Sequence, residues 1–457
     1  MNPSTMMKTH KHRKQLVPLS FSLLVAFCVY LILPSTCPEP ARRMAFIFIL
    51  AAFFWALEII PLFATSLLVV LLESLLLTGG IEKIPYTSFL APLANPVIVL
   101  FLGGFVLARA FQKYKIDHWL VSDLLHFFGS KPYFVLLGFM VATAFLGMWI
   151  SNTAATALML PMIFPLLHHL GAKDNFKKAL VLAIPFAARI GGITTPVGTP
   201  TNAIAIGLLA ERGISIHFIT WTIVTLPLAV FLLLATSVIL YRLFPPEQKE
   251  LIYKIEKVGT LDLKPKLVAA IALSTAFLWL SAAWLHVPES VTALLSISLL
   301  TGLKLIDSDD IKKIDWDILL LMWGGLALGE GMEKTGLATW VTSLPILPHI
   351  EWQIYLLVCL VSVFLSTFIS NTATVNLLIP IALTMPVGDT ALLAVIVALG
   401  ASFDIALPTA TPPMAMAYGT REISIKDMLK AGIIFAFLAN SLLLFGAETM
   451  MKRVFIR

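Results

Sequence analysis

Charged residues are scarce in this sequence. Asp, Glu, Lys and Arg together make up 13% of its 457 residues, whereas 59% are hydrophobic. Soluble globular domains carry about a quarter charged residues, so the composition indicates a polytopic helical membrane protein. The length suits one membrane domain made of two fused repeats. The formal net charge of +6 is then a matter of membrane topology, and we expect no nucleic-acid partner.

Cysteine is scarce as well. Cys28, Cys37 and Cys359 lie in or beside hydrophobic segments, with no CxxC pair and no histidine partner. This pattern is typical of small buried hydrophobic side chains and argues against a disulfide framework. The sequence also lacks a nucleophile paired with a base, or a metal-ligating cluster, which an intramembrane enzyme would need. We therefore expect neither an enzyme nor an organic cofactor.

Acidic residues in the middle of hydrophobic segments are few. A cation–proton antiporter would need closely spaced acids there, and only Asp404 lies near an expected helix break. A channel is disfavoured because the repeated polar groups of this chain would form a closed site with several ligands.

The hydrophobic segments predict about eleven membrane spans and two shorter re-entrant hairpins. The segment 1–40 contains the first helix, which we interpret as retained because it lacks a small-residue cleavage site. Most Lys and Arg lie on one side if the N-terminus is cytoplasmic, and the basic linker 245–265 lies on that side too. The expected spans are near residues 16–34, 44–61, 63–79, 96–112, 178–210, 216–241, 266–285, 290–305, 317–333, 389–418 and 428–450.

The tetrapeptide Ser-Asn-Thr-Ala occurs twice in apolar surroundings, from Ser151 and from Ser370. Neighbouring segments repeat too, with LFLGG matching LMWGG before the tetrapeptide and GTPTNAIA matching ATPPMAMA after it. We infer a first repeat over 41–244 and a second over 266–457. With an odd number of spans in each, the repeats are inverted about an axis in the membrane plane.

Each tetrapeptide lies in a stretch that is too long for one span and too short for two. We expect 132–168 and 351–386 to be helical hairpins that enter and leave the membrane on one side, with the tetrapeptide at the tip and prolines punctuating the arms. Hydroxyls and amides at membrane depth are tolerated where they line a cavity or complete a broken helix.

A Thr-Pro pair lies inside each of the apolar segments 178–210 and 389–418. Thr is a good N-cap and Pro fits the first helical position, so a new half-helix should begin at each pair. The tetrapeptides carry N-cap chemistry too. Four helix N-termini, each with roughly half a unit of positive charge, would converge and suit a small dianion. The unwound carbonyls and polar side-chain oxygens suit Na⁺.

Four segments carry a family resemblance: SNTA followed by LMLP, SNTA followed by LLIP, GGITTPVGTPTNAIA and LPTATPPMAMA. They resemble the signatures of the divalent anion–sodium symporter (DASS) family, the INDY-type dicarboxylate transporters, and the similarity covers the chain after residue 40. The resemblance implies an all-α fold of eleven spans plus two hairpins. It also implies a homodimer with a static scaffold and elevator-type movement of a transport domain.

The resemblance further implies which residues bind. A first Na⁺ site would use Ser151, Asn152 and Gly198, with a backbone oxygen from Gly147. A second would use Ser366, Asn371 and Ala410, with a backbone oxygen from Ile369. The substrate carboxylates would be held by Asn152, Thr153, Thr199, Pro200, Asn371, Thr372, Thr411 and Pro412.

Two charges within spans depart from the family pattern. Arg189 lies where a small or amide residue is usual, and Asp404 lies where the family is usually apolar. Intramembrane charges are kept most cheaply as a pair. The pair is either a structural ion pair or a coupling device in which Arg189 supplies the positive charge that relatives obtain from Na⁺.

We therefore expect a secondary transporter of the bacterial inner membrane. Its expected substrates are C4 dicarboxylates such as succinate, malate and fumarate, moved together with Na⁺. Sodium-independent exchange of dicarboxylates or tricarboxylates, and transport of an inorganic anion such as sulfate, are the alternatives that the sequence leaves open.

Overall fold

The computed structural model describes residues 3–78, 84–171, 173–251, 262–344, 350–404, 406–408 and 410–446. Side chains are described from residue 17 onward, except that of His126. Helices account for all of the regular structure in this part of the chain, which holds no β-strand. The all-α fold expected from the sequence is confirmed.

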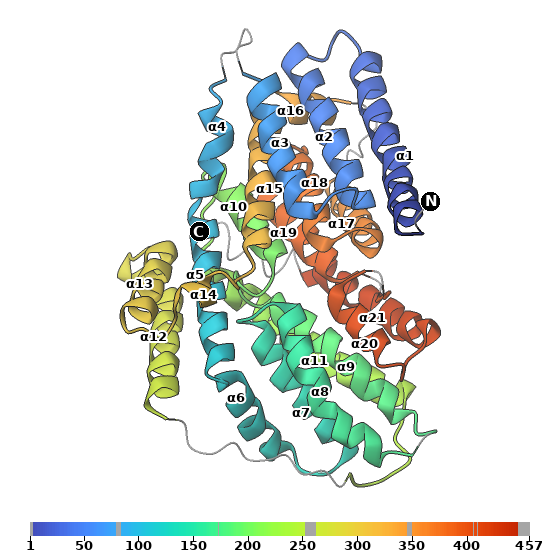
Figure 1. The fold of residues 1–457 in the computed structure, drawn as a ribbon, viewed down its shortest axis with the longest axis vertical. Coiled ribbons are helices and arrows are strands. Elements are labelled where there is room, and N and C mark those ends of the chain that lie inside the picture. Colours follow the sequence, from blue (N-terminus) through green and yellow to red (C-terminus); the bar gives the residue numbers. More distant parts are fainter. Residues whose placement is uncertain are drawn as a thin grey trace.

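The first half of the chain forms helices that are joined mostly by short turns (Figure 1). These are α1 (Pro3–Ile32), α2 (Glu39–Leu57), α3 (Leu62–Leu76), α4 (Thr87–Leu90), α5 (Pro96–Lys113), α6 (Ile116–Leu125), α7 (Pro132–Gly147), α8 (Asn152–His169), α9 (Phe176–Gly192), α10 (Pro200–Glu211) and α11 (Phe218–Leu243). Of these, α6 was not expected as a separate helix, because its ten residues are too few and too polar for a span.

The second half follows with a similar succession of long and short helices. These are α12 (Leu263–Leu285), α13 (Glu289–Gly302), α14 (Ser308–Ile311), α15 (Trp316–Lys334), α16 (Leu337–Thr342), α17 (Glu351–Phe368), α18 (Asn371–Ala382), α19 (Thr390–Ser402), α20 (Pro412–Gly419) and α21 (Ile425–Gly446). The expected last span, 428–450, runs beyond Gly446 into residues outside the described part.

Six helices of the described chain are long and apolar enough to cross a membrane. They are α2, the combined stretch Thr87–Lys113, α11, α12, α17 and α21. Shorter apolar helices, among them α3, α7, α13, α18 and α19, add to these. The protein is therefore a multi-pass membrane protein, and the count of eleven spans stays a prediction.

The two halves repeat one order of packing. The first hairpin arm α7 packs on α9 as α17 packs on α19, and the second arms α8 and α18 pack on the same partners. Other contacts cross between the halves, because α5 packs on α13 and α15 packs on α3. The short half-helices cross as well: α10 packs on α18 and α19, and α20 packs on α8 and α9.

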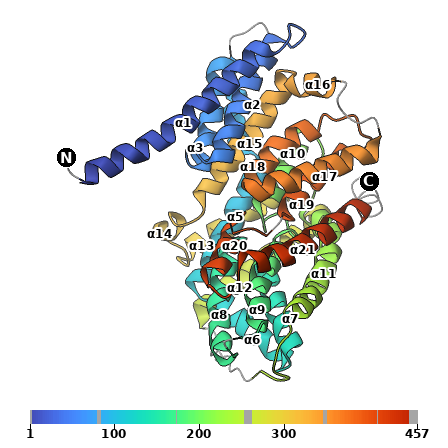
Figure 2. The same cartoon turned by 90° about the vertical axis from the view of Figure 1, so that its right-hand side faces the viewer.

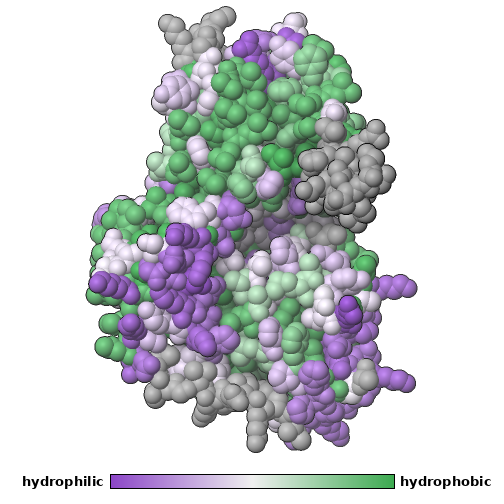
Figure 3. All heavy atoms as spheres, in the orientation of Figure 1, coloured by the Kyte–Doolittle hydropathy of each residue, from purple (hydrophilic) through white to green (hydrophobic). Residues whose placement is uncertain are grey.

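These contacts give an elongated molecule in two parts. One part contains α1–α3 with α15–α18, the other contains α6–α9 with α11, and α5 runs between the parts beside α12 and α13 (Figures 1 and 2). The visible surface is largely hydrophobic, with hydrophilic residues gathered beside the middle of the molecule and along its lower edge (Figure 3). The helix breaks and the hairpin tips lie where the short half-helix of each half packs against helices of the other half.

Prolines lie within the second arm of each hairpin. Pro161 and Pro165 lie inside α8, and Pro380 lies inside α18, without ending either helix. Proline removes one helical hydrogen bond, but packed neighbours in a membrane protein can tolerate this. The second arms begin directly after Ser151 and Ser370, which are their N-caps.

Candidate functional site

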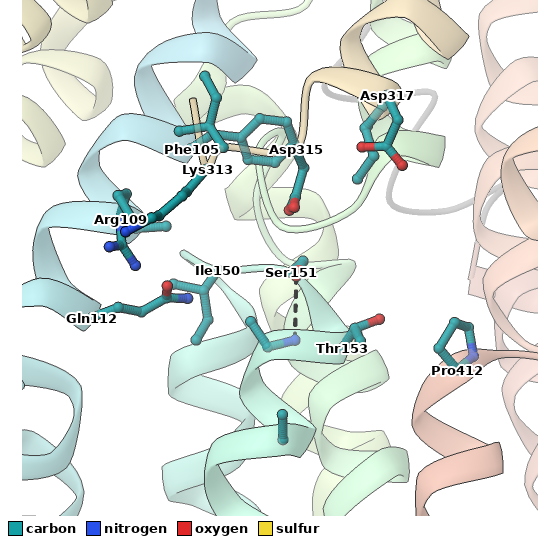
Figure 4. A pocket seen from close by; sticks show the side chains of 15 residues that line it. Phe105, Arg109, Gln112, Ile150, Ser151, Thr153, Lys313, Asp315, Asp317 and Pro412 are labelled. Carbon is teal, nitrogen blue, oxygen red and sulfur yellow. Dashed lines mark hydrogen bonds between the residues drawn. The ribbon is translucent and has the colours of Figure 1, made fainter. Parts of the chain in front are cut away.

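The first hairpin turns at the sequence Met148–Ser151, between α7 and α8. Ser151 is the N-cap of α8, and its side-chain oxygen accepts a hydrogen bond from the backbone N–H of Ala154 at 3.3 Å. Figure 4 shows this bond as the dashed line at the tip. A capped N-terminus leaves the remaining amides of the first turn directed out of the helix, where an anion can accept from them.

The second hairpin repeats this arrangement. Ser370 is the N-cap of α18, and its side chain accepts from the backbone N–H of Ala373 at 3.1 Å. Ile369 is the C-cap of α17. Ser366 lies one turn earlier, where its hydroxyl donates to the carbonyl oxygen of Val363 at 3.4 Å. The N-cap chemistry predicted for both tetrapeptides is therefore present in the structure.

Both apolar segments break where the Thr-Pro pairs predicted a break. In the first, α9 ends at Gly192 and α10 begins at Pro200; in the second, α19 ends at Ser402 and α20 begins at Pro412. Thr199 and Thr411 occupy the two N-cap positions in extended backbone conformation. The structure thus places Ala410 in an unwound stretch, directly before a half-helix.

The expected capping by the two threonine side chains is wrong. Neither Thr199 nor Thr411 makes a side-chain cap hydrogen bond. The Thr199 hydroxyl instead accepts from the hydroxyl of Thr201 at 3.4 Å. A capping side chain accepts from the amide of the second or third helical residue, and in α20 the second residue is Pro413, which has no N–H. Both hydroxyls are therefore available for roles other than capping.

Backbone oxygens and one amide side chain crowd together at the first tip. A Cβ atom at Gly198 would lie 2.4 Å from the carbonyl oxygen of Gly192 and 2.9 Å from that of Gly147. A Cβ atom at Gly192 would lie 2.5 Å from Oδ1 of Asn152. The loop is held to the tip by Thr195, whose hydroxyl donates to the carbonyl oxygen of Met148 at 2.6 Å. Glycine is required here because no side chain fits between these oxygens.

The asparagine of each tetrapeptide has an unsatisfied oxygen. Oδ1 of Asn152 and Oδ1 of Asn371 are both buried without a hydrogen-bond partner among the described residues. A buried polar atom without a partner costs free energy, roughly 1–3 kcal/mol. An uncoordinated amide oxygen among carbonyl oxygens is a hard ligand of the kind that Na⁺ accepts. In both repeats, the asparagine of the tetrapeptide thus has a buried oxygen that can accept a hydrogen bond or bind a cation.

A pocket of about 430 Å³ opens at the first tip. Ser151 and Thr153 line it from below, and Pro412 lines it from the other half of the chain (Figure 4). Asp315 and Asp317 lie above the tip in the same view. The pocket therefore joins the first tetrapeptide to the second Thr-Pro pair.

Only Thr153 and Pro412 of the eight predicted substrate-binding residues line this pocket, and the other six, which include Asn152 and Thr411, do not. Thr199 and Pro200 lie at the first break, and Asn371 and Thr372 lie at the start of α18; none of the four is among its lining residues. The second tip, with Ser366 and Ile369, belongs to packing between α17, α18 and α19. The structure thus brings together the first tip and Pro412, but not all eight residues in one cavity.

Arg109 of α5 forms part of another wall of the pocket. Its guanidinium forms a 3.0 Å ion pair with Asp310 of α14. Lys113, one turn later, forms a second ion pair with the same carboxylate. Burial opposes ionisation of Asp310, but the hydrogen bonds from Lys113, the Asp307 amide and Arg109 lower its pKa to about 2.

The two unusual charges do form a buried pair. Nη1 of Arg189 lies 2.5 Å from Oδ1 of Asp404, and the exposed fractions of the two side chains are 4% and 0%. Nη1 also donates to the carbonyl oxygen of Asp404 at 3.3 Å, and Nη2 donates to the hydroxyl of Thr411 at 3.2 Å. Oδ2 of Asp404 has no described partner. The pair therefore reaches a predicted substrate-binding residue.

Comparison with known proteins decides the family. The sequence model of the citrate transporter family (CitMHS) matches residues 52–400 of this chain. The chain belongs to the citrate transporter family. Sodium-dependent dicarboxylate transporter SdcS of Staphylococcus saprophyticus is 33% identical over 451 residues, which cover 90% of this chain and 86% of that protein. SdcS of Staphylococcus aureus is 32% identical over 456 residues, covering 91% and 86%.

One solved structure shows the fold of this citrate transporter family member. The crystal structure of the YdaH transporter of Alcanivorax borkumensis matches with a TM-score of 0.53 and 13% identity, covering 85% of this chain and 96% of that one. Together the comparisons confirm the DASS-type resemblance and identify a transporter rather than an enzyme. In a transporter, the hairpin tips at Ser151 and Ser370, with their buried amide oxygens, are candidates for the transport site.

Sequence reasoning gave no role to four residues of the pocket: Arg109, Lys313, Asp315 and Asp317. For Arg109 a signal was present, since a charge inside a predicted span is a candidate for function. Lys313 and Asp315 lie in the connection to α15 and Asp317 lies in its first turn, where charged residues are ordinary. Their approach to the first tip depends on α5 packing against α13, which no local pattern reveals.

Proposed function

We propose that this protein is a secondary transporter that moves small C4 dicarboxylates, such as succinate, malate and fumarate, together with Na⁺. The names of the SdcS relatives support both the substrate class and the ion. The observation that carries the proposal is the pair of buried amide oxygens, Asn152 Oδ1 and Asn371 Oδ1, each beside a serine-capped helix start.

We assign the first Na⁺ to the oxygens of Gly147, Ser151, Asn152 and Gly198. The crowding of the Gly147 and Gly192 carbonyls around Gly198 supports this assignment. We assign the second Na⁺ to Ser366, Ile369, Asn371 and Ala410, by analogy between the repeats. In each case the cation would satisfy an amide oxygen that otherwise stays buried and unpaired.

We assign the anion to the starts of the four helices α8, α10, α18 and α20. Each helix start carries partial positive charge, so two of them can hold each carboxylate without a basic side chain. The first-turn amides of α8 and α18 can donate to the anion, whereas α10 begins with one proline and α20 with two, which have no N–H. The bound Na⁺ ions would neutralise the dianion further and make binding of anion and cation interdependent. The residues assigned to the anion are Asn152, Thr153, Thr199, Pro200, Asn371, Thr372, Thr411 and Pro412.

The repeated packing order also supports a mechanism. We propose inverted repeats over 41–244 and 266–457, joined by the linker 245–265, in a homodimer of the bacterial inner membrane with a cytoplasmic N-terminus. The hairpins and broken helices would form the transport domain of an elevator. The crossed contacts of α5 with α13 and of α15 with α3 would form the scaffold against which it moves.

Flux measurements test the proposal. Purified protein in vesicles should take up labelled succinate when Na⁺ is higher outside, and uptake should fall to the level of empty vesicles when choline replaces Na⁺. Dissipating the Na⁺ gradient with an ionophore is the matched control. Equal uptake in Na⁺ and choline would reject sodium coupling, while no uptake of succinate with robust uptake of citrate or sulfate would reject the substrate class.

The Arg189 contact supports a second candidate function. A guanidinium that reaches Thr411 places a fixed positive charge at the start of α20, where a sodium ion would otherwise be needed. Such a site would exchange dicarboxylates or tricarboxylates without Na⁺. Uptake that persists in choline, and that requires an anion inside the vesicle, distinguishes exchange from symport.

A further inference from the structure

An apolar cavity lies against a face of α5 that adjoins the face lining the pocket at the first tip. It measures about 290 Å³ and lies between α5, α6, α7 and α12. Its lining contains no charged or hydroxyl-bearing side chain, and three tryptophans, Trp119, Trp149 and Trp279, contribute to it. Trp279 uses its indole N–H in a hydrogen bond to the carbonyl oxygen of Glu289 at 3.0 Å. Water would find few partners in such a space.

The cavity reaches the surface of the protein at Leu273 and Phe145. Their exposed fractions are 72% and 41%, whereas Leu107 and Val197, which also line the cavity, are 8% and 6% exposed. Leu273 belongs to α12, which has the least buried window of the six candidate spans, at 28%. A span this exposed faces bilayer hydrocarbon, so the opening of the cavity faces hydrocarbon too.

We propose that this cavity is a binding site for one acyl chain of a membrane lipid. A flexible, unbranched hydrocarbon can enter past Leu273 and reach Leu107 and Val197. Once buried, the hydrocarbon fills the apolar space and makes dispersion contacts with the aromatic and aliphatic side chains that line it. A polar substrate would meet no charged or hydroxyl-bearing side chain there.

The occupant would touch the back of the first tip. Trp149 lies two residues before Ser151, and Val197 lies directly before Gly198. Val197 also packs on α5, since a Cβ atom at Gly104 would lie 3.4 Å from its Cβ. Ala108 lines both the apolar cavity and the pocket at the first tip. The acyl chain would therefore lie between α5 and the two loops that carry Trp149 and Val197, directly beside the first tip.

Photolabelling tests the proposal directly. The protein is reconstituted in phosphatidylcholine vesicles that contain a phosphatidylcholine with a diazirine near the end of one acyl chain. After illumination, labelled residues are mapped by mass spectrometry. We expect label on Leu107 or Val197, which are shielded from the outer lipid, in addition to Leu273. Label confined to outward-facing residues of α12 in the wild-type protein would overturn the proposal.

A matched pair of variants on α12 gives the control. Ala272 lines the cavity and is half-buried, whereas Ala270 is exposed and outside the lining. Ala272→Phe should reduce labelling at Leu107 and Val197 by at least tenfold, and Ala270→Phe should leave it unchanged. Ala276→Phe, also at the cavity wall, replaces Ala272→Phe if that protein is not monodisperse. Undiminished labelling in a folded, filled variant would overturn the site.

Discussion

The guanidinium of Arg189 contacts both Asp404 and Thr411, two residues for which the sequence predicted separate roles. Nη1 pairs with the Asp404 carboxylate, and Nη2 donates to the Thr411 hydroxyl at 3.2 Å. Arg189 belongs to α9 of the first half, whereas both partners belong to the second break. The contact ties the end of one broken helix to the start of the other.

The first prediction concerns this pair. Arg189→Asn and Asp404→Ala should each destabilise the protein by roughly 3–5 kcal/mol, because removing one partner strands a buried charge. The double variant should recover most of the loss, since no uncompensated charge remains. Thermal unfolding in detergent, followed by fluorescence-detected size exclusion, measures the effect. Additive losses in the double variant would show that the two side chains act independently.

Transport by the same variants distinguishes a structural role of the Arg189–Asp404 pair from a role in sodium coupling. If the pair is structural, succinate uptake by the double variant depends on Na⁺ as uptake by the wild type does. If Arg189 replaces a sodium charge, wild-type uptake persists in choline, and Arg189→Asn abolishes uptake or gains sodium dependence. We expect the first result, because the oxygens assigned to both sodium ions are present.

The second prediction concerns the unsatisfied amides. Asn152→Ala or Asn371→Ala should abolish succinate uptake, because each removes an oxygen shared between an ion and the anion. Expression and elution volume should change little, since neither Oδ1 has a described protein partner to lose. Uptake assays on equal amounts of reconstituted protein make the comparison. Normal uptake in both variants would remove the basis of the site assignment.

The third prediction uses the missing threonine caps. Thr199→Val and Thr411→Val keep the shape of the side chain and remove only the hydroxyl. Because the Thr199 hydroxyl does not cap its helix, Thr199→Val should cost well below the roughly 1 kcal/mol typical of a lost cap. Thr411→Val should cost more, since the Thr411 hydroxyl accepts a hydrogen bond from the buried Arg189 guanidinium. Affinity for succinate should fall more than tenfold. As a contrast, Ser151→Ala removes a cap that is present and should lower the unfolding temperature measurably.

The fourth prediction concerns the ion pairs behind the pocket. Asp310→Asn should destabilise the protein by roughly 2 kcal/mol at pH 7, since it weakens charged hydrogen bonds to Arg109 and Lys113. The pKa of Asp310 is lowered from 3.8 to about 2 in the folded protein, so this stability is present above pH 3.8. It is lost as the pH falls through about 2. The difference in unfolding temperature between wild type and variant should shrink over that window and stay constant from pH 5 to 7.

Local chemistry explains how much of this fold the sequence could predict. The helix breaks at Thr199-Pro200 and Thr411-Pro412, and the capped tips at Ser151 and Ser370, follow from residues within one turn of each other. The repeat made these signals stronger because each occurs twice. The Arg189–Asp404 pair was predictable for a different reason: two opposite charges in apolar segments are stable only together.

The parts that the sequence missed depend on contacts between distant segments. The contact of Arg109 with Asp310 requires α5 to pack on α13, and the apolar cavity requires α12 to face α6 and α7 across it. Neither follows from a periodic pattern. The predicted cap hydrogen bonds of Thr199 and Thr411 do not form. A good N-cap residue can make a different hydrogen bond when a tertiary partner is near, as Thr411 does with Arg189.

The last prediction tests the crowding at the first tip. Gly192→Ala adds a Cβ atom that would lie 2.5 Å from Oδ1 of Asn152, so the amide must turn away from the oxygens of Gly147 and Gly198. The three heavy atoms nearest to that Cβ all belong to the Asn152 side chain, so we expect the protein to fold with the amide displaced. We expect a loss of succinate uptake of at least tenfold, with a higher Na⁺ concentration needed for half-maximal rate. Gly302→Ala is the control, because nothing lies within 4 Å of an added Cβ there, and it should behave as the wild type. Unchanged sodium dependence in a well-folded Gly192→Ala protein would separate Asn152 from the first ion.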